Sequence, residues 1–318
     1  MNDPIHIRGV SKSFDNRVAV SNVSLAVKSG EVLVLMGLSG SGKSTLLRMI
    51  NGLIKPTSGH VEINGRPLQD LSPKELITMR RQRMAMVFQS FALLPHRTAL
   101  DNAAFGLEVA GLPRKQRLER ARQALERVGL ANDLHRKPHQ LSGGMRQRVG
   151  LARALALDPP ILLMDEAFSA LDPLIRHDMQ NLLLELQDAD QRTIVFVSHD
   201  LNEAVRIGDR IAVMEDSQLL QCDSAVELLL HPKHTAVKAF FNSVDKTAIL
   251  NLGAIAEAPV DGIDLEDPDL IVLSASTRLK DAIGTIANAT GVVAVINADH
   301  SLAGVVSAQT MLRVIERP

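Results

Sequence analysis

Five short stretches of the chain are hydrophobic without interruption. They are "EVLVLMG" from Glu31, "MAMVFQ" from Met84, "ILLMDE" from Ile161, "TIVFVSHD" from Thr193 and "RIAVMED" from Arg210. Continuous rather than alternating hydrophobicity predicts strands that are buried on both faces, and helical periodicities lie between several of them. The pattern therefore predicts an α/β fold in which helices cover a largely parallel sheet.

Two regions depart from this rhythm. The charged amphipathic helix "RKQRLERARQALERVGL" has no strand beside it, so we expect an inserted helical subdomain over about residues 98–150 of a first domain spanning 1–240. Residues 241–268 include "EAPVDGIDLEDPD", with six acids and no base, and are expected to be a solvated linker. Residues 269–318 carry a β-α-β-β-α pattern and predict a small second domain.

Composition narrows the possible functions. The 318 residues are 46% hydrophobic, as in a packed globular protein, and 35 Lys and Arg nearly balance 36 Asp and Glu. Such a balance does not favour a dedicated nucleic-acid binder. The single cysteine, Cys222, excludes an internal disulfide and is expected to be an inert core thiol. No stretch resembles a signal peptide or a membrane span, so we expect a cytoplasmic protein.

The stretch "GLSGSGKST" carries the first candidate chemistry. It matches the phosphate-loop pattern G-x-x-x-x-G-K-[ST] and lies between a predicted strand and a predicted helix. Glycines let backbone N–H groups approach a phosphate, the lysine bridges the β- and γ-phosphates, and the serine ligates Mg²⁺. The expected ATP- and Mg²⁺-binding residues are Gly37, Leu38, Ser39, Gly40, Ser41, Gly42, Lys43, Ser44 and Thr45.

A pair of acids ends the strand "ILLMDE". Asp165 is placed to hold Mg²⁺, and Glu166 to act as general base toward the attacking water. Taken alone, the pair also fits two surface acids at the end of a strand. The neighbouring phosphate loop favours the catalytic interpretation.

Three further residues are candidates because of their positions in the pattern. Gln89 and His199 end two other strands, so in a parallel sheet both would lie near the γ-phosphate. His199 would hold that phosphate and fix the water, although a lone histidine at a strand end is more often structural. Phe14 is placed to stack on adenine, and an ordinary core phenylalanine is the alternative.

The stretch "LSGGMRQR" is a half-built phosphate site. Ser142, Gly143 and Gly144 stand at the predicted start of a helix, where backbone N–H groups point outward, but no lysine follows them. By itself the stretch would hold phosphate poorly.

These motifs, in this order, resemble those of the ATP-binding subunits of ABC transporters over about residues 5–240. The resemblance implies an ABC-type P-loop ATPase. Its motifs are the Walker A loop at Gly37–Thr45, the Q-loop residue Gln89, which also ligates the metal, and the signature Leu141–Met145. They continue with the Walker B pair Asp165 and Glu166, the D-loop Ser169–Asp172, the switch residue His199 and the A-loop residue Phe14.

The resemblance also implies partners. In that family two subunits stack head to tail, so the signature of one covers the ATP on the Walker A loop of the other. We expect a homodimer on the cytoplasmic face of the inner membrane, attached to permease subunits and served indirectly by a substrate-binding protein. No nucleic-acid partner is expected. Residues 91–95 would receive a coupling helix of the permease.

The stretches "MGLSGSGKSTLLRMINGLIKPTSG" and "EAFSALDPLIR", with Met145 in the signature, look like the subfamily that imports glycine betaine, proline betaine or choline. Importers of amino acids or other osmolytes remain an alternative. So does a soluble ABC ATPase, although that class usually has two cassettes or a coiled-coil insertion. An exporter would ordinarily carry fused membrane helices.

The tail resembles one CBS unit where the subfamily often has two. Its "GVVSAQT" departs from the nucleotide-binding motif because Thr310 stands where a ribose-binding aspartate is expected. This puts nucleotide binding by the tail in doubt. We expect residues 269–318 to pair across the dimer as a structural or regulatory module, and a sensor of salt is compatible with that role.

Overall fold

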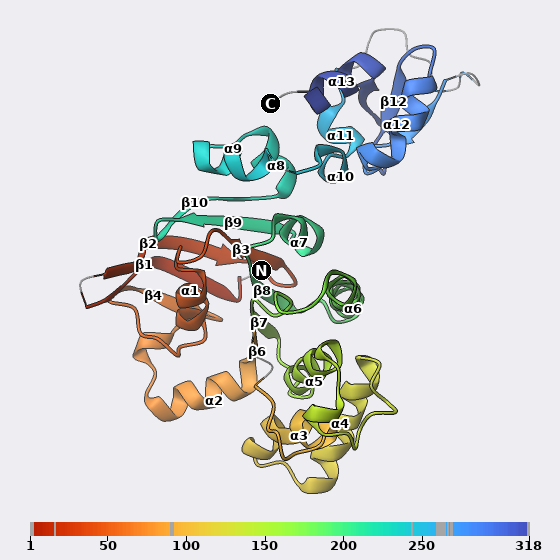
Figure 1. The fold of residues 1–318 in the computed structure, drawn as a ribbon. Coiled ribbons are helices and arrows are strands. Elements are labelled where there is room, and N and C mark those ends of the chain that lie inside the picture. The colour runs from red at the N-terminus through yellow and green to blue at the C-terminus, as the bar shows by residue number, and fades with distance from the viewer. Residues whose placement is uncertain are drawn as a thin grey trace. The chain divides into compact units, whose positions relative to one another are not determined.

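The computed structural model describes residues 3–15, 17–89, 92–242, 244–258, 265, 267 and 270–316. The chain divides into two compact units, Met1–Ser224 and Ala225–Pro318 (Figure 1). Each unit has its own hydrophobic core. Among the described residues, no helix combines the length and the apolar character needed to cross a bilayer.

A six-stranded sheet forms the centre of the first unit, in the order β10-β9-β3-β8-β7-β6. All neighbours are parallel except the edge pair β9 and β10. The strands are β3 (Val32–Met36), β6 (Met84–Phe88), β7 (Ile161–Asp165), β8 (Thr193–Ser198), β9 (Arg210–Glu215) and β10 (Gln218–Asp223). The five predicted strands are therefore present and parallel, and β3, β7 and β8 are buried at every residue.

Helices cover both faces of this sheet, as the continuous hydrophobicity requires. The helix α1 (Lys43–Ile50) lies on one face, and α6 (Pro173–Asp190) and α7 (Leu201–Ile207) lie on the other (Figure 1). Alternate strand residues such as Leu33 and Leu35 pack with α1 and with the second sheet in one core. This arrangement confirms the predicted α/β class.

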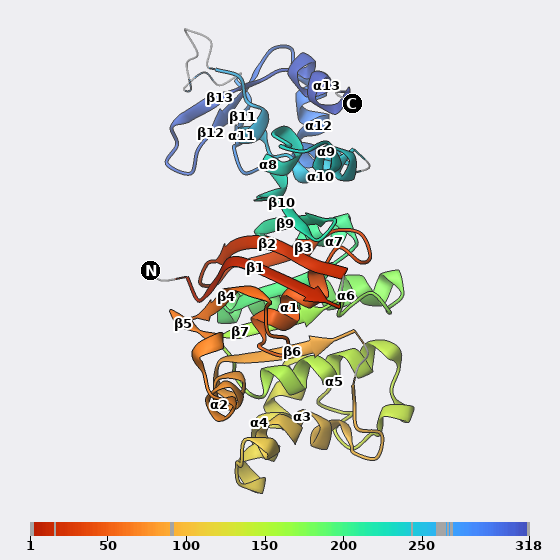
Figure 2. The same cartoon turned by 90° about the vertical axis from the view of Figure 1, so that its left-hand side faces the viewer.

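A four-stranded antiparallel sheet, in the order β2-β1-β4-β5, adds to this core (Figure 2). Its strands are β1 (Ile5–Phe14), β2 (Arg17–Val27), β4 (Ser58–Ile63) and β5 (Arg66–Pro67). The five apolar stretches do not include it. Its strands are only partly buried, and β1 pairs with both neighbours through register shifts that break the regular alternation of a strand.

The remaining helices of the first unit lie mainly where the helical subdomain is predicted. They are α2 (Pro73–Arg83), α3 (Ala99–Val109), α4 (Arg114–Arg127) and α5 (Gly143–Leu155), with short 3-10 turns at Leu68–Asp70 and Pro138–Gln140. Ser72 and Glu75 form a capping box at the start of α2. Helices α3, α4 and α5 pack against one another, so an all-helical layer interrupts the strand pattern.

The second unit contains the predicted β-α-β-β-α order. Its sheet runs β11-β12-β13, with the first pair parallel and the second antiparallel. The elements are β11 (Val272–Ser274), α12 (Leu279–Asn288), β12 (Val293–Ile296), β13 (Leu302–Val306) and α13 (Ala308–Glu316). Ile286, Val293 and Val306 are among the buried residues of its core.

This unit begins at Ala225, before the boundary that the sequence places after residue 240. It includes α8 (Ala225–Leu230), α9 (Thr235–Phe241), α10 (Lys246–Ile249) and α11 (Leu252–Ile255). Leu250, Leu252 and Ile255 are buried in its core, so this part of the expected linker is packed structure. Most of "EAPVDGIDLEDPD" lies outside the described residues.

Candidate functional site

The carboxyl ends of four neighbouring strands bring the predicted catalytic residues together. In the sheet, Met36 pairs with Ser198, Val197 pairs with Asp165, and Asp165 pairs with Phe88. The residues that follow these strand ends are Gly37, His199, Glu166 and Gln89. They therefore come to one edge of one sheet, where ligands bind in open α/β folds.

The phosphate loop joins β3 to α1. Gly42, the residue before α1, has a φ of 98°, and a Cβ there would lie 2.2 Å from the carbonyl oxygen of Ala19. Gly40 has a φ of 84° and open space on its Cβ side. Glycine is thus required at position 42 both by the backbone conformation and by the close approach of another segment.

The side chain of Lys43 lies along its own loop. Its Nζ donates hydrogen bonds to the carbonyl oxygens of Gly37 at 2.7 Å and Leu38 at 2.8 Å, and only 4% of the residue is exposed. Burial lowers the pKa of Lys43, while the nearby charges of Glu166 and Asp165 raise it. The net direction is downward, but two carboxylates face the amine and favour its cationic form.

Ser44 and Asp165 meet across the site. The Ser44 hydroxyl donates to Asp165 Oδ1 at 2.7 Å, and the carboxylate is 7% exposed. Arg48, one helical turn after Ser44, approaches Asp165 Oδ2 at 3.7 Å. The side chain is therefore not a solvent-exposed acid at a strand end, and a hydroxyl and a carboxylate together are the oxygen ligands that Mg²⁺ prefers.

Glu166 is held from several sides. Gln89 Nε2 donates to Glu166 Oε2 at 3.3 Å, and the same oxygen lies 3.6 Å from His199 Nδ1. Gln89 also donates to Ser169 Oγ at 3.2 Å, and that hydroxyl donates to the Glu166 carbonyl. Glu166 has a φ of 47°, a conformation that is uncommon outside glycine and typical of turns at functional sites.

A pocket of about 370 Å³ lies over the phosphate loop. Phe14 lines it together with Arg17, Gly40, Lys43 and Glu166, and 45% of the phenylalanine is exposed. Lys12 Nζ stacks 4.9 Å from the ring centroid. Phe14 is therefore not a core residue, and its ring forms one wall of the pocket that Lys43 also lines.

The signature residues lie elsewhere. Ser142 caps α5 by accepting from the Met145 amide at 3.2 Å. A methyl group on Gly144 would lie 2.5 Å from Ile175 Cγ2, and one on Gly143 would lie 4.0 Å from Leu171 Cδ2. Among the described residues, the lining of the phosphate pocket includes none from Leu141–Met145. The two phosphate-binding layouts of one chain thus do not share a pocket.

The segment between β7 and α6 adjoins the signature. Asp172 caps α6, where its Oδ1 accepts from the Ile175 amide at 3.1 Å. Because Leu171 and Ile175 face the two signature glycines, Ser169–Asp172 lies between the signature and the turn at Glu166.

An open groove lies beside this edge of the sheet, with a volume of about 680 Å³. It is lined by residues of the core and of the helical layer, namely Arg48, Phe88, Gln89, Ala92, Leu93, Pro138, Arg146, Asp165 and Ala170. Of the segment 91–95 that the sequence singles out, Phe91 lies outside the described residues, and Ala92 and Leu93 line this groove. The groove therefore extends from Gln89 and Asp165 at the sheet edge to the segment predicted to receive a partner.

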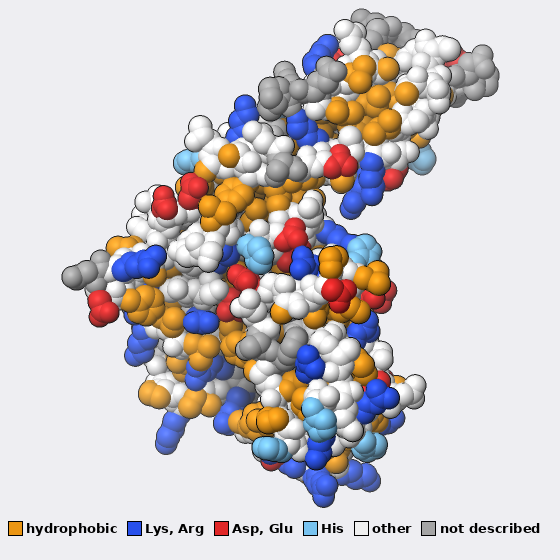
Figure 3. Space-filling model, in the orientation of Figure 1, with side chains coloured by type: hydrophobic (Ala, Val, Ile, Leu, Met, Phe, Trp, Pro, Cys, Tyr) orange, Lys and Arg blue, Asp and Glu red, His pale blue; other side chains and the backbone are white. Residues whose placement is uncertain are grey.

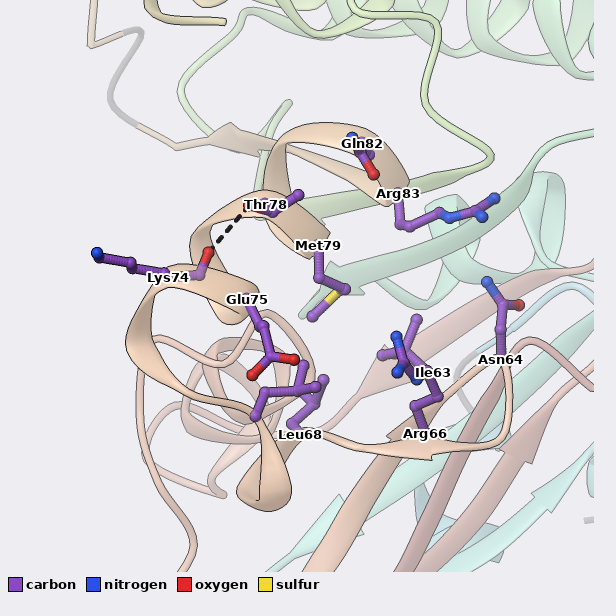
Figure 4. A pocket seen from close by; sticks show the side chains of 11 residues that line it. Ile63, Asn64, Arg66, Leu68, Lys74, Glu75, Thr78, Met79, Gln82 and Arg83 are labelled. Atoms are coloured by element: carbon purple, nitrogen blue, oxygen red, sulfur yellow. Dashed lines mark hydrogen bonds between the residues drawn. The ribbon is translucent and has the colours of Figure 1, made fainter.

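A separate pocket of about 440 Å³ lies between α2 and the turn from β4 to β5 (Figure 4). Ile63, Leu68 and Met79 supply an apolar lining, and cationic side chains stand around it. Figure 4 shows Lys74 pointing away from Arg66 and Arg83, so the charges do not converge on one point. This pocket lacks the converging donors of the site around Lys43.

Lys and Arg side chains gather over the part of the first unit that holds α3 and α4 (Figure 3). Several are paired. Arg122 contacts Glu119 at 2.7 Å and Glu126 at 2.8 Å, and Arg127 contacts Asp190 at 2.6 Å. Paired charges weaken the field that this surface projects into solvent.

Cys222 lies apart from the site. Burial raises the pKa of its thiol to about 11, and Arg210 donates to its Sγ at 3.0 Å. It packs against the main core, so the thiolate that reagents attack is scarce at neutral pH.

Arg48 was not among the predicted site residues. It lies four residues after Ser44 on the same helix, and its guanidinium approaches Asp165 from the side opposite the serine. The helical i,i+4 spacing from the phosphate-loop serine is the signal in the sequence that could have identified it.

Comparison with known proteins shows which family the chain resembles. The sequence model of the ABC transporter family matches residues 20–169. The chain is 53% identical over 264 residues to the glycine betaine/proline betaine transport system ATP-binding protein ProV of Escherichia coli strain K12. That match covers 83% of this chain and 66% of the relative, so the chain spans just under two thirds of its length.

The chain is also 44% identical over 300 residues to the glycine betaine/carnitine transport ATP-binding protein GbuA of Listeria monocytogenes serotype 1/2a. This match covers 94% of the chain and 73% of GbuA. Among solved structures it is similar to a dimeric post-hydrolysis state of the ATP-binding cassette MJ0796 bound to ADP and Pi. The TM-score is 0.63 and the identity 38%, covering 69% of this chain and 98% of that one.

Proposed function

The chain belongs to the ATP-binding proteins of the ABC transporter family, and on that premise we propose that it hydrolyses ATP to power the import of glycine betaine, choline or a related quaternary amine. The convergence of Lys43, Asp165 and Glu166 at one sheet edge carries this proposal. In this function the chain is a peripheral subunit on the cytoplasmic face of the inner membrane.

The loop Gly37–Thr45 binds the ATP phosphates. The amides at the start of α1 have no side-chain cap, so they are available to an anion. Lys43 exchanges its bonds to the Gly37 and Leu38 carbonyls for the β- and γ-phosphates, and Phe14 stacks on adenine.

Mg²⁺ fits the oxygen atoms beside the loop. The Ser44 hydroxyl and the Asp165 carboxylate already lie together, and Gln89 is the third candidate ligand. When bound, Mg²⁺ neutralises charge on the β- and γ-phosphates. Asp165 is buried, so a cation there would relieve the cost of desolvating its charge.

Glu166 acts as the general base. It lies at the strand end next to Asp165 and contacts both Gln89 and His199. In this role Glu166 orients the attacking water and accepts its proton, while His199 holds the γ-phosphate and fixes the water. The Gln89 bonds to Glu166 and Ser169 keep the base from turning away from the phosphate.

The signature completes the site of a second copy. Ser142 is exposed at the start of α5, and Gly143 and Gly144 leave the backbone there without side chains. These groups donate to the γ-phosphate of an ATP bound to the partner's phosphate loop. ATP thus joins two copies, and hydrolysis releases them, which drives motion in the attached permease.

The substrate class rests on similarity. ProV is a glycine betaine/proline betaine transport protein, and GbuA is a glycine betaine/carnitine transport protein. The groove beside Gln89 receives a segment of the permease, and a binding protein delivers the solute to the permease. Import of another osmolyte or an amino acid is the second candidate, and a soluble ABC ATPase without a permease is the third.

The second unit is CBS-like and pairs two tails across the dimer. Its support is the β-α-β-β-α order from Val272 to Glu316. Thr310 is buried and shares its hydroxyl with Ser307 at 2.9 Å. It has no charge to offer a ribose, so we expect the tail to bind adenosine nucleotides poorly.

The substitution Glu166→Gln tests the catalytic proposal. It removes the base but keeps the shape and the bonds to Gln89, so ATP hydrolysis should fall by about 100-fold or more while ATP binding persists. Size-exclusion chromatography with ATP should then show a trapped dimer. Full hydrolysis by this variant would overturn the assignment of Glu166, and a lack of uptake of labelled glycine betaine by the complete transporter would overturn the substrate class.

A further inference from the structure

Two loops beside the catalytic edge meet on one side chain. Arg176 of α6 donates through Nη1 to Asp200 Oδ2 at 3.2 Å. Its Nη2 donates to the main-chain carbonyls of Ser169 at 3.4 Å and Leu171 at 3.1 Å. We call these three contacts the Arg176 bridge. It joins the segment that follows Glu166 to the residue that follows His199.

The Asp200 end of the bridge is anchored in a polar network. Asp200 Oδ1 accepts from the amides of Asn202 and Glu203, which caps α7. Its own amide donates to Ser198 Oγ at 3.0 Å, and Ser198 donates to Glu203 Oε2 at 2.5 Å. Gln180 of α6 donates to the other oxygen of Glu203, which is 6% exposed. Movement of Asp200 therefore disturbs several linked hydrogen bonds, two of which, between Ser198 and Glu203 and between Gln180 and Glu203, are buried.

The other end of the bridge lies against the signature. Leu171, whose carbonyl the bridge holds, faces Gly143, and Ile175 faces Gly144 more closely. Ser169 is tied to the Glu166 carbonyl and to Gln89. A shift of the signature is thus transmitted by packing to the same segment that Arg176 grips.

The geometry of the guanidinium group lets the single side chain of Arg176 make all three contacts. A planar fork with fixed N–H directions holds a carboxylate and two carbonyls at once, which a lysine ammonium does not reproduce. Arg176 Nε is buried and has no hydrogen-bond partner among the described residues. Burying this donor without a partner costs free energy. The three other hydrogen bonds of the Arg176 side chain offset that cost.

We propose that Arg176 is a positioning residue that couples the signature to the switch histidine of the same chain. This inference rests on the proposed function, because there the signature contacts the partner's ATP while His199 serves the chain's own ATP. Occupancy of one composite site then sets the placement of His199 at the other. The bridge makes hydrolysis at the two sites cooperative.

A purely structural tie between helices is the competing explanation, and the chain supplies a matched control. Arg206 of α7 donates to His177 and to Asn181 of α6, the latter at 2.6 Å. It links the same two helices with the same chemical group. It touches neither Ser169–Asp172 nor Asp200.

The experiment compares Arg176→Met and Arg176→Lys with Arg206→Met in the full chain. ATP hydrolysis is measured against ATP concentration, together with the thermal unfolding midpoint. We expect Arg176→Met to lower kcat by about 10-fold or more and the Hill coefficient toward 1, with KM changed less than about 3-fold. Arg176→Lys should rescue little, and Arg206→Met should keep kcat and cooperativity while its midpoint falls comparably.

Asp200→Asn keeps the inference testable should Arg176→Met fold poorly. Asparagine still caps α7, but it removes the charge that Arg176 holds. Asp200→Asn should also lower kcat and the Hill coefficient. The double variant should show no greater loss than Arg176→Met alone.

Wild-type kinetics in Arg176→Met, equal losses in Arg206→Met, or additive losses in the double variant would each overturn the inference. If the wild-type chain hydrolyses ATP cooperatively in that case, the proposed function still stands. A wild-type chain without ATP hydrolysis overturns the proposed function and the coupling with it.

Discussion

The chain contains two serine- and glycine-rich helix N-termini that differ in whether a side chain caps the first backbone amides. At α1 the residue before the helix is Gly42, and no side chain caps the helix. At α5 the corresponding residue is Ser142, whose hydroxyl satisfies the Met145 amide. The first start has a lysine and two acids around it, whereas the second is backed by the apolar side chains of Leu171 and Ile175.

This difference shows that two similar stretches of sequence can form a complete and an incomplete phosphate site. A phosphate site needs uncapped amides, a cation and a place for the metal, and α1 brings all three together. At α5, glycine serves packing as well as exposure, because Gly144 is buried against Ile175. The proposed function accordingly assigns the second start to the site of a second copy.

The largest effect is expected when the phosphate loop is inactivated in one subunit and the signature in the other. Lys43→Ala and Ser142→Arg should each abolish ATP occlusion, since every homodimer then lacks one half of both sites. An equal mixture should recover about a quarter of the wild-type sites, because half of the dimers are mixed and each of these has one intact site. Occlusion is measured by retention of labelled ATP.

The double variant Lys43→Ala/Ser142→Arg is the control, and it should occlude nothing. No recovery in the mixture, with both variants folded, would contradict the head-to-tail arrangement.

The two signature glycines should separate packing from binding. A methyl group at position 144 would approach Ile175 to 2.5 Å, so Gly144→Ala should lower the free energy of unfolding by about 1–3 kcal/mol. Gly143→Ala meets no such contact and should leave stability unchanged or raised, while weakening ATP-dependent dimerisation about 10-fold. Chemical denaturation and analytical ultracentrifugation measure the two effects.

Ile175→Ala removes the side chain that the new methyl group would meet. The loss of unfolding free energy caused by Gly144→Ala should therefore be smaller in an Ile175→Ala background. Equal stability losses at positions 143 and 144 would show that the packing against Ile175 does not distinguish them.

Capping should give the smallest effect. Ser142→Ala removes the cap of α5 and should lower the free energy of unfolding by about 1 kcal/mol. Ser72→Ala, in the capping box of α2, is the matched control with a similar expected loss. Only Ser142→Ala should also raise the ATP concentration needed for dimerisation. An equal shift in both variants would mean that Ser142 acts through stability alone.

The sequence predicts the central sheet well because its strands are buried on both faces. Runs such as Val32–Met36 and Ile161–Asp165 have no polar residue before their last position, and the residues after them fall at one edge of the sheet. Two acids, a glutamine and a histidine at strand ends were therefore predictable as neighbours. The antiparallel sheet was missed because β1 is interrupted by bulges.

Contacts made through tertiary packing were beyond reach of the pattern. Arg176 and Asp200 are separated by a helix and a strand, and nothing in their local sequence pairs them. The segment around Leu250 was included in the predicted linker because the acidic, proline-containing stretch after it indicates solvated chain, yet Leu250 packs in the core of the second unit. The burial of such short segments depends on the surface they pack against, so it cannot be predicted from their own sequence.

The side chain of Lys43 is held by its own loop. Its three donors are directed at atoms of its own loop, so the loop keeps one conformation and little chain entropy remains to be lost on binding. In the proposed function these bonds are exchanged for bonds to phosphate, which would moderate the affinity for nucleotide. In the proposed function, a lysine that is ordered in advance by its own loop would favour rapid exchange of nucleotide between turnovers.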